Sequence, residues 1–390
     1  MSLLRLLIVT PRYWPLADKI ERGLATLAES LHGPAIRATI LTAAWGPDWP
    51  CQVIHREIPV HRVPHPPQGG WYTLRFLRRV ARWLRDHRGE FDVVYVANLR
   101  NEAYATIGAL QRDQVPVVVR AGEHDVAWQQ QARFGRRVHI RCQRADAIVV
   151  NTAQSAQTLV EAGYEPQRIH EIPWGVPVAP QRSSAARIEA RKALAAANHD
   201  LAADDVTPVA ICVTRLDNCS ALRPLVATWK IIAARWPGAK LWLIGDGPHR
   251  HDIYDVVVER GMHRDIFMPG SFDELEDVFQ AADLCIAADQ SVAESPALLQ
   301  AMASGLPIIA NDTDVNRDLV NDNVQGLLVQ SQDVAALTSA ISKLLETPHL
   351  SARMSAAARL LVSERHASAA SAASHLSLFE QLVTDRRNSV

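Results

Sequence analysis

The chain has 390 residues, a length that favours two domains of about two hundred residues each. Its 48% hydrophobic and 21% charged residues are ordinary for a soluble globular protein. The five cysteines are odd in number and include no CxxC pair, which argues against a disulfide framework and a structural zinc site. No apolar run has the length of a membrane span, and residues 3–9 include Arg5 and lack a small-residue cleavage site, so we expect a cytoplasmic protein.

The net charge of −1 hides an asymmetry between the two halves of the chain. Residues 1–173 carry 22 Lys and Arg against 16 Asp and Glu, a net charge of +6. Residues 174–390 carry 19 against 26, a net charge of −7. A basic half and an acidic half suggest that the two halves face different partners.

The first half has the pattern of an open, doubly wound sheet. An apolar strand at 3–9, a helix at about 20–32 and a strand at about 37–42 form a βαβ unit. After a Pro-rich loop and a further helix, three more buried strands are expected at 91–97, 115–119 and 147–150.

The helix expected at 71–88 is strongly basic. Its apolar face consists of Leu74, Leu77, Val80, Ala81 and Leu84, and the rest carries Arg75, Arg78, Arg79, Arg82 and Arg85. Such a helix could lie against anionic lipid head groups, as a peripheral contact at the inner face of a membrane. Equally, it could be an outer helix that packs on the sheet and keeps a solvated charged face.

Polar residues follow the strand expected at 115–119, and ligands bind at the carboxyl ends of strands in open α/β sheets. Arg120, Glu123, His124 and Asp125 could hold the hydroxyl groups of an acceptor, with His124 or Asp125 taking a proton. Alternatively, Asp125 caps a helix and His124 fills a loop.

A stiff crossing at residues 172–176, Ile-Pro-Trp-Gly-Val, leads into a second series of elements. Beyond Pro348 the composition turns to Ala, Ser and Arg, which indicates terminal helices. In between, a helix is expected at 225–236, and strands are expected at 209–214, 240–244, 266–268, 284–287, 308–310 and 326–329. The chain thus repeats one α/β architecture without repeating its sequence.

The pattern of residues 291–312 predicts a short buried helix that leads into a buried strand. Ser295 is a good N-cap, whose side-chain oxygen accepts a first-turn N–H, and Pro296 is a good first helical residue. Gly305 fits the left-handed position after the helix, and Pro307 prevents the helix from resuming. A helix start that faces a cleft offers free N–H groups and a positive dipole, which suits a diphosphate.

A series of short motifs runs along the chain: Ile20-Glu21-Arg22, residues 145–150, residues 172–176, Arg215-Leu216, Gly245-Asp246-Gly247-Pro248, residues 300–303 and Gly305-Leu306-Pro307. In this order and at these intervals they make the chain similar to family 4 of the retaining glycosyltransferases. The resemblance covers nearly the whole chain and is strongest from Val213 to Val329.

The resemblance implies an α/β protein of GT-B architecture, in which two Rossmann-like domains with parallel sheets face a central cleft. Residues 1–173, joined by a C-terminal helix at about 372–390, would form the acceptor domain. Residues 174–371 would form the donor domain. The implied reaction, of the kind used in polysaccharide biosynthesis, moves a sugar from a nucleotide diphosphate-sugar to a hydroxyl of a glycan or lipid-linked acceptor. It retains the anomeric configuration and needs no metal, cofactor or nucleic acid.

Arg215 matches the family's phosphate-binding arginine, which stabilises the leaving diphosphate. The backbone N–H groups of Ser295, Ala297 and Leu298, with Pro296 between them, match its phosphate-binding helix start. The simpler interpretation is that Arg215 is part of a surface ion pair.

The glycine motif implies a second part of the donor site. Gly245, Asp246 and Gly247 would let the backbone pass close to the nucleotide. The simpler interpretation is an ordinary turn.

The chain departs from the family pattern at three places. Asp18-Lys19 replaces the glycine pair of the first loop, and no lysine follows Arg215 in the stretch 217–220. Val292 and Gln300 replace the two glutamates that frame the helix start. Lys19 or Arg317 could supply the missing cation, and Gln300 can hydrogen-bond a ribose hydroxyl.

Two functions of different classes therefore remain open. The first is an active glycosyltransferase with an atypical donor site, which the helix start at Ser295-Pro296 favours. The second is a catalytically impaired GT-B pseudoenzyme that serves as a nucleotide-binding or scaffold partner, which the loss of the lysine, glutamate and glycine residues favours.

Overall fold

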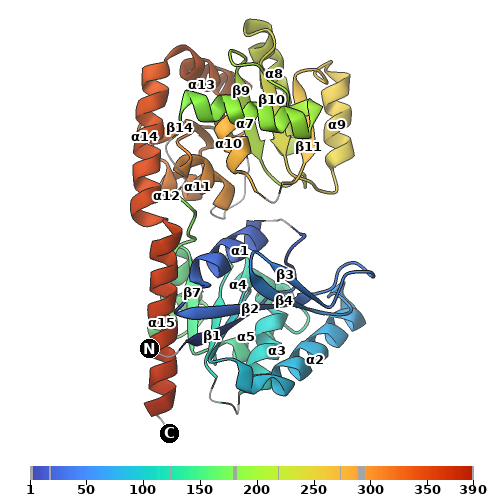
Figure 1. Cartoon of the computed structure of the whole chain (residues 1–390), viewed down its shortest axis with the longest axis vertical. Coiled ribbons are helices and arrows are strands. Elements are labelled where there is room, and N and C mark those ends of the chain that lie inside the picture. The colour runs from blue at the N-terminus through green and yellow to red at the C-terminus, as the bar shows by residue number, and fades with distance from the viewer. Residues whose placement is uncertain are drawn as a thin grey trace. The chain divides into compact units, whose positions relative to one another are not determined.

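The structure is a computed structural model that describes residues 3–16, 19–111, 113, 115–122, 124–178, 182–217, 219–272, 274–288 and 295–388, without the side chains of Lys19 and Ala221. The chain forms two compact α/β units, as expected (Figure 1). Unit 1 comprises Met1–Gly175 and Ser368–Val390, and unit 2 comprises Val176–Ala367. The sequence prediction put these boundaries at 173 and 372. None of the helices in the described part of the chain is both long and apolar enough to cross a membrane.

Unit 1 is built on an eight-stranded sheet. Its strands are β1 (Leu4–Val9), β2 (Ile36–Ala43), β3 (Gln52–His55), β4 (Ile58–Val63), β5 (Val93–Val96), β6 (Val117–Arg120), β7 (Ala147–Val150) and β8 (Ile169–Glu171). They lie in the order β3-β4-β2-β1-β5-β6-β7-β8, and all pairs are parallel except β3 with β4. The strands β3, β4 and β8 were not predicted from the sequence.

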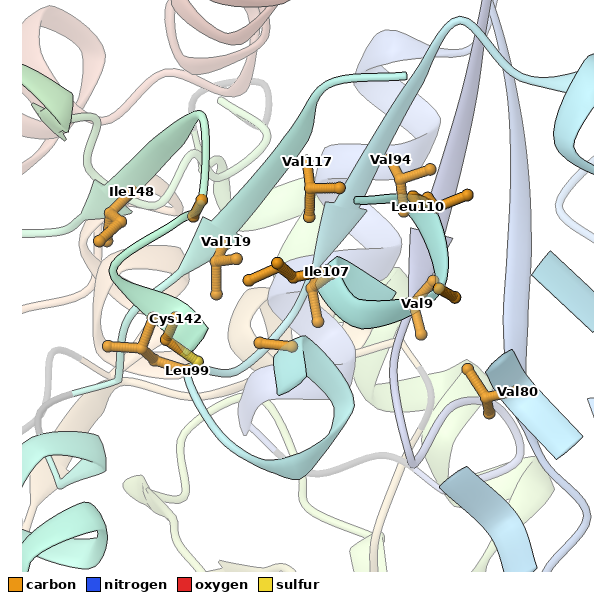
Figure 2. Close-up of a cluster of buried hydrophobic side chains, with 14 of the residues drawn as sticks. Val9, Val80, Val94, Leu99, Ile107, Leu110, Val117, Val119, Cys142 and Ile148 are labelled. Atoms are coloured by element: carbon orange, nitrogen blue, oxygen red, sulfur yellow. The ribbon is translucent and has the colours of Figure 1, made fainter. Parts of the chain in front are cut away.

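The helices of unit 1 cover this sheet. They are α1 (Lys19–Leu31), α2 (Gly70–Asp86), α3 (Asn101–Leu110), α4 (Asp125–Gln131), α5 (Gly135–Cys142), α6 (Ala153–Glu161) and α15 (Ser368–Asn388). Figure 2 shows the main core of this unit, where Val94 and Val119 of the sheet gather with Ile107 of α3 and Cys142 of α5. Neighbouring residues of a strand face opposite sides of the sheet. Accordingly Tyr95 of β5 leaves this core and contacts Phe379 of α15 edge-on.

The basic helix α2 packs on the sheet through Phe76, Val80 and Leu84, which are buried. Leu77 and Ala81 are partly buried beside them, whereas Leu74 is 39% exposed. Leu74 thus lies at the exposed margin of the predicted apolar face, and the buried side includes Phe76, which was not assigned to that face. The helix is therefore an outer helix of the domain, and whether its charged face meets lipid or only solvent stays a prediction.

Unit 2 is built on a six-stranded, fully parallel sheet. Its strands are β9 (Val209–Val213), β10 (Lys240–Ile244), β11 (Ile266–Gly270), β12 (Leu284–Ala287), β13 (Ile308–Asn311) and β14 (Gly326–Val329). All six were predicted within two residues at each end. They lie in the order β11-β10-β9-β12-β13-β14, the strand order of a classical dinucleotide-binding sheet.

Eight helices complete the described part of unit 2. They are α7 (Ser184–Ala197), α8 (Cys219–Arg235), α9 (Arg250–Glu259), α10 (Glu276–Ala281), α11 (Pro296–Ala303), α12 (Asp314–Leu319), α13 (Val334–Glu346) and α14 (Pro348–Arg365). The helix α8 begins six residues before the predicted start at 225, with Pro224 inside it. Trp229 of this helix lies fully buried in the core between helices and sheet.

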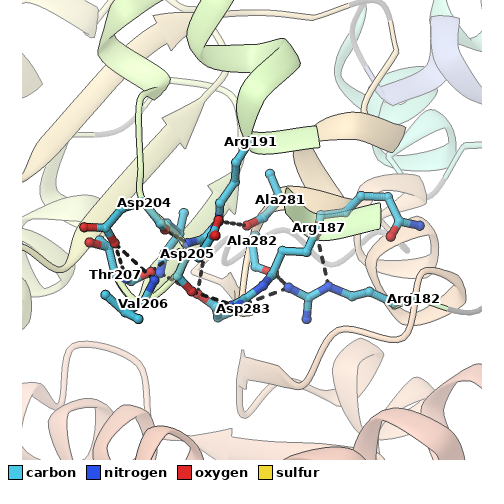
Figure 3. A network of polar contacts seen from close by, with 12 residues as sticks. Arg182, Arg187, Arg191, Asp204, Asp205, Val206, Thr207, Ala281, Ala282 and Asp283 are labelled. Atoms are coloured by element: carbon cyan, nitrogen blue, oxygen red, sulfur yellow. Dashed lines mark hydrogen bonds and ion pairs between the residues drawn. The ribbon is translucent and has the colours of Figure 1, made fainter. Parts of the chain in front are cut away.

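A polar network fastens α7 to the start of β12 (Figure 3). Arg187 and Arg191 donate to Asp283 at 2.7 and 2.8 Å, and Arg182 lies 3.5 Å from the same carboxylate. Asp283 also accepts a bond from the backbone N–H of Val209 at 2.9 Å. Burial lowers the pKa of Arg182 to about 10. The network lies at the amino ends of β9 and β12, so it fixes the two central strands from the end opposite their carboxyl-end loops.

Candidate functional site

The carboxyl ends of the strands in unit 2 bring most of the predicted donor-site residues to one edge of the sheet. The strands β9 and β12 lie side by side in the middle, and the chain proceeds from β9 to one side and from β12 to the other. Such a reversal of strand order leaves a crevice at the carboxyl ends, where ligands bind in open α/β sheets. The loops after β9, β10, β12 and β13 carry Arg215, the Gly245–Gly247 turn, the start of α11 and Arg317, respectively. We call this edge the switch edge.

Arg215 is exposed and follows β9 directly. Its Nε and Nη2 donate to the two carboxylate oxygens of Asp217 at 2.6 and 3.0 Å. The side chains of the pair are 41% and 45% exposed. The surface ion pair that the sequence left open as the simpler interpretation is therefore present. The same guanidinium lies on the switch edge, where the donor site was predicted.

The glycine turn after β10 packs against the loop after β9. Leu216 N–H donates to the carbonyl of Asp246 at 3.1 Å, and His249 N–H donates to the carbonyl of Leu216 at 2.9 Å. A Cβ on Gly245 would lie 1.9 Å from the carbonyl oxygen of Thr214, and one on Gly247 would lie 2.6 Å from that of Leu216. The two glycines thus let the two loops meet backbone to backbone, which holds Arg215 beside the turn.

Asp246 points its side chain outward from this turn. The carboxylate accepts the N–H of Gly247 at 2.8 Å, and its other near neighbour, Arg250, is 3.9 Å away. The side chain is 65% exposed, so it contributes a negative charge to the switch edge.

The start of α11 has the predicted residues but not the predicted cap. Ser295 is the N-cap and Pro296 the first helical residue, yet the Ser295 side chain accepts no N–H of this turn. Its carbonyl accepts the N–H of Leu299 at 3.1 Å, as the regular helix requires. The N–H groups of Ala297 and Leu298 precede the first intrahelical bond, so they are the groups that a cap or a ligand has to satisfy. The expectation of a side-chain cap was wrong, and among the described residues no other acceptor replaces it for those two groups.

The rest of this helix follows the prediction. Gly305 has a φ of +76° and occupies the left-handed position after the C-cap. Gln300 is half-buried on the second turn. Val292, which replaces the first of the two family glutamates, lies outside the described residues.

Arg317 lies in α12, the helix that follows β13 at the switch edge. Its Nε and Nη2 donate to the two oxygens of Asp312 at 2.6 and 2.9 Å, and its Nη1 lies 3.4 Å from Asp314. The bond to Arg317 lowers the pKa of Asp312, and the same bond raises the pKa of Arg317. Lys19, the other substitute cation, begins α1 in unit 1, and its side chain lies outside the described residues.

In unit 1, Arg120 is buried at the carboxyl end of β6. Its Nη1 donates to the hydroxyl of Tyr95 at 3.0 Å, its Nη2 donates to Asn151 and to the carbonyl of Ile172, and its guanidinium lies 3.6 Å from the ring centre of Trp174. The guanidinium therefore links three strands to the crossing segment. This burial favours a structural role over the predicted contact with an acceptor.

Two further buried residues complete that link, and their packing was not predicted from the sequence. Trp174 contacts α1 at Gly23, where a Cβ would lie 2.8 Å from the ring. His375 of α15 lies edge-on to Tyr95 and hydrogen-bonds the carbonyl of Ser371 at 2.7 Å. Burial, with a smaller effect of Arg120, lowers the pKa of His375 to about 3. The motif at residues 172–176 includes Trp174 but does not indicate its packing role, and no motif marks His375, because both roles depend on the three-dimensional packing.

Asp125 is also buried, at the first turn of α4. It accepts the N–H groups of Leu99 at 2.8 Å and Gly122 at 2.9 Å, and Arg100 Nε donates to it at 2.6 Å. These bonds join the loop after β5 to the loop after β6. The carboxylate thus has a structural role close to the capping role that the sequence left open.

His124 is the N-cap residue of α4, and its side chain is exposed and makes no capping bond. Glu123, the other predicted acceptor residue, lies outside the described residues. Among the side chains that the structure describes, no three His, Cys, Asp or Glu residues are grouped closely enough to hold a metal ion. That the reaction needs no metal stays a prediction.

Two family models match the chain. The model of Glycosyltransferase Family 4 matches residues 20–179, and the model of Glycosyl transferases group 1 matches residues 207–347. The second match includes the described loops of the switch edge.

Known proteins with similar sequence or structure agree with these matches. D-inositol 3-phosphate glycosyltransferase of Nocardia farcinica is 30% identical over 211 residues, which span 52% of this chain and 45% of that protein. Sucrose-phosphate synthase of Thermosynechococcus elongatus has a similar fold, with a TM-score of 0.77 over 98% of this chain and 100% of that chain, at 18% identity. HepE of Anabaena, solved in complex with UDP and glucose, gives a TM-score of 0.72 over 99% and 100% of the two chains, at 18% identity.

Proposed function

We propose a glycosyl-transfer function from one premise, namely that this chain belongs to the family 4-like glycosyltransferases of the GT-B fold. In this proposal it moves a sugar from a nucleotide diphosphate-sugar to a hydroxyl acceptor, with retention at the anomeric carbon and without a metal. The observation that carries the proposal is the switch edge, which combines Arg215 with the start of α11 at the reversal of strand order.

The chemistry required at this edge is stabilisation of the diphosphate as it leaves. Negative charge develops on the phosphate oxygens when the bond to the sugar breaks, and donors that are already positioned stabilise that charge most effectively. The N–H groups of Ala297 and Leu298 and the positive end of the helix dipole supply fixed donors. Arg215 supplies a full charge and bidentate geometry.

The acceptor is proposed to bind on unit 1, through a hydroxyl of a glycan or a lipid-linked saccharide. Among the described candidates Arg120, His124 and Asp125, His124 has the exposed side chain. We therefore assign the contact with the acceptor hydroxyl to His124 and leave Arg120 and Asp125 to hold the loops around it.

Helix α2 supports a peripheral membrane contact, at the cytoplasmic side, for such an acceptor. Its exposed surface combines Trp71, which is 62% exposed, and Tyr72, which is 52% exposed, with the arginines Arg78, Arg79, Arg82 and Arg85. Aromatic rings beside basic groups suit the interface of an anionic bilayer. Sedimentation with liposomes tests this contact. We expect binding that requires anionic lipid and weakens in salt, and absence of such binding would leave α2 a solvated face.

One observation favours the alternative, a GT-B pseudoenzyme that binds nucleotides or serves as a scaffold. Two arginines of the switch edge, Arg215 and Arg317, are bound by aspartates, and the stretch 217–220 after Arg215 contains no lysine. Once nucleotide binding has been shown, a transfer assay separates the two functions. An active enzyme would release the sugar from the donor, whereas a pseudoenzyme would bind the nucleotide and release none.

A thermal-shift panel tests the donor site. UDP, GDP, ADP and their sugars are compared on the wild type and on Arg215→Ala. We expect one nucleotide series to raise the Tm of the wild type by mass action, and we expect Arg215→Ala to reduce that rise. If no nucleotide stabilises the wild type, the donor site is refuted. If the rise survives in Arg215→Ala, the role of Arg215 is refuted.

A further inference from the structure

Each arginine described on the switch edge after β9 and β13 is bound by an aspartate of its own loop. Arg215 binds Asp217 through two parallel hydrogen bonds, and Arg317 binds Asp312 in the same way. This is the geometry in which a guanidinium binds either a carboxylate or a phosphate. The carboxylates therefore occupy the Nε–Nη2 sides with which these arginines would grip a diphosphate.

The charge of the described switch edge is also unfavourable for a polyanion. Residues 214–217, 245–250, 295–300 and 311–317 include three arginines and four aspartates: Arg215, Arg250, Arg317, Asp217, Asp246, Asp312 and Asp314. A nucleoside diphosphate that reaches Arg215 must displace or approach the carboxylate of Asp217, which is 45% exposed and can therefore swing into solvent without breaking the core.

We propose that Asp217 competes with the diphosphate for Arg215 and thereby weakens the binding of the released nucleoside diphosphate more than that of the nucleotide-sugar. This inference rests on the proposed function. Near pH 7.5 the free diphosphate carries about one more negative charge than its sugar ester, because a terminal phosphate group loses its second proton near pH 6 and the ester lacks that proton. Repulsion from Asp217 therefore acts more strongly on the product and favours its release.

The variant Asp217→Asn tests the proposal, because it removes the charge and keeps the size of the side chain. Calorimetric titrations use UDP, GDP and ADP together with UDP-glucose, GDP-mannose and ADP-glucose. We expect the Kd of the bound nucleoside diphosphate to fall about five- to tenfold and that of its sugar ester to fall less, with both gains shrinking in 0.5 M salt. Asp205→Asn removes the same charge before the amino end of β9 and should change neither value.

Unchanged or weaker binding of the diphosphate by Asp217→Asn would overturn the proposal and would instead assign Asp217 to orienting Arg215. Equal gains for the diphosphate and its sugar ester would overturn the preference against the product. A separate result tests the proposed function. If neither the wild type nor Asp217→Asn binds any nucleotide, both the function and the role of Asp217 are refuted. If the wild type binds a nucleotide and Arg215→Ala abolishes that binding, the proposed function is supported whatever the result for Asp217→Asn.

Discussion

At the scale of single residues, the glycines of the turn after β10 do more than shorten a loop. Gly245 has a φ of +144°, a backbone conformation that side chains rarely adopt, and both Gly245 and Gly247 face the backbone of residues 214–216 at distances that leave no room for a Cβ. The backbone of Arg215 is thus held beside the turn by the close packing of the two loops.

We predict that Gly247→Ala lowers the free energy of unfolding by ~2 to 4 kcal/mol, because the new methyl group must push two loops apart. Chemical denaturation measures this change. Gly261→Ala is the matched control, since Gly261 has a φ of +70° but a Cβ placed on it would meet nothing within 4 Å, so it should cost only ~1 kcal/mol of backbone strain. Equal losses in the two variants would contradict the packing role of Gly247.

The sequence predicted which residues reach the switch edge but not their partners. Arg215 was assigned to the donor site from the resemblance to the family motifs, and the ion pair considered for it was given no partner, whereas the structure pairs it with Asp217. By contrast, the burial of Arg120 depends on Trp174 and His375, which are distant in sequence. No local pattern distinguishes an arginine that reaches a ligand from one that stacks on a buried ring.

At the scale of elements, the helix α15 is attached to unit 1 through a neutral histidine. His375 is 1% exposed, and its pKa of about 3 lies well below the ordinary value of about 6.5. Between these two values the unfolded chain binds more protons than the folded one, so stability is lost as the pH falls.

We predict that lowering the pH from 7.5 to 5 costs ~2 kcal/mol of stability through His375 alone. Urea unfolding at the two pH values checks this. The variant His375→Gln should be less stable at pH 7.5 but should lose ~2 kcal/mol less on acidification. His349→Gln, at an exposed position of α14, should behave like the wild type. An unchanged pH dependence in His375→Gln would contradict the prediction.

Periodicity identified the central parallel strands of both sheets but missed strands at both edges of the sheet in unit 1, namely β3 and β4 at one edge and β8 at the other. The strands β3 and β4 lie in a Pro-rich stretch, and Pro59 lies inside β4, where a proline argues against a strand. The helix α8 was predicted to begin at 225, directly after Pro224, although it begins six residues earlier at Cys219. In both cases tertiary packing outweighs the local preference of proline.

At the scale of the whole molecule, the two units share one architecture but differ in charge and in the use of their carboxyl edges. Unit 1 fills the carboxyl ends of β5 and β6 with buried polar links, namely Arg120 and Asp125. Unit 2 leaves Arg215, Asp246 and Arg317 exposed on the switch edge. The family relationship was predictable from the order of the motifs, whereas the substrates depend on loops that follow no specific code.

Hydrogen–deuterium exchange with and without a saturating nucleoside diphosphate tests the central claim most directly, because it locates the ligand on the chain. We predict slower exchange in peptides that cover residues 213–217, 244–249 and 296–300, and loss of that protection in Arg215→Ala. Protection that appears only in peptides of unit 1, or that is unchanged in Arg215→Ala, would contradict the assignment of the donor site to the switch edge.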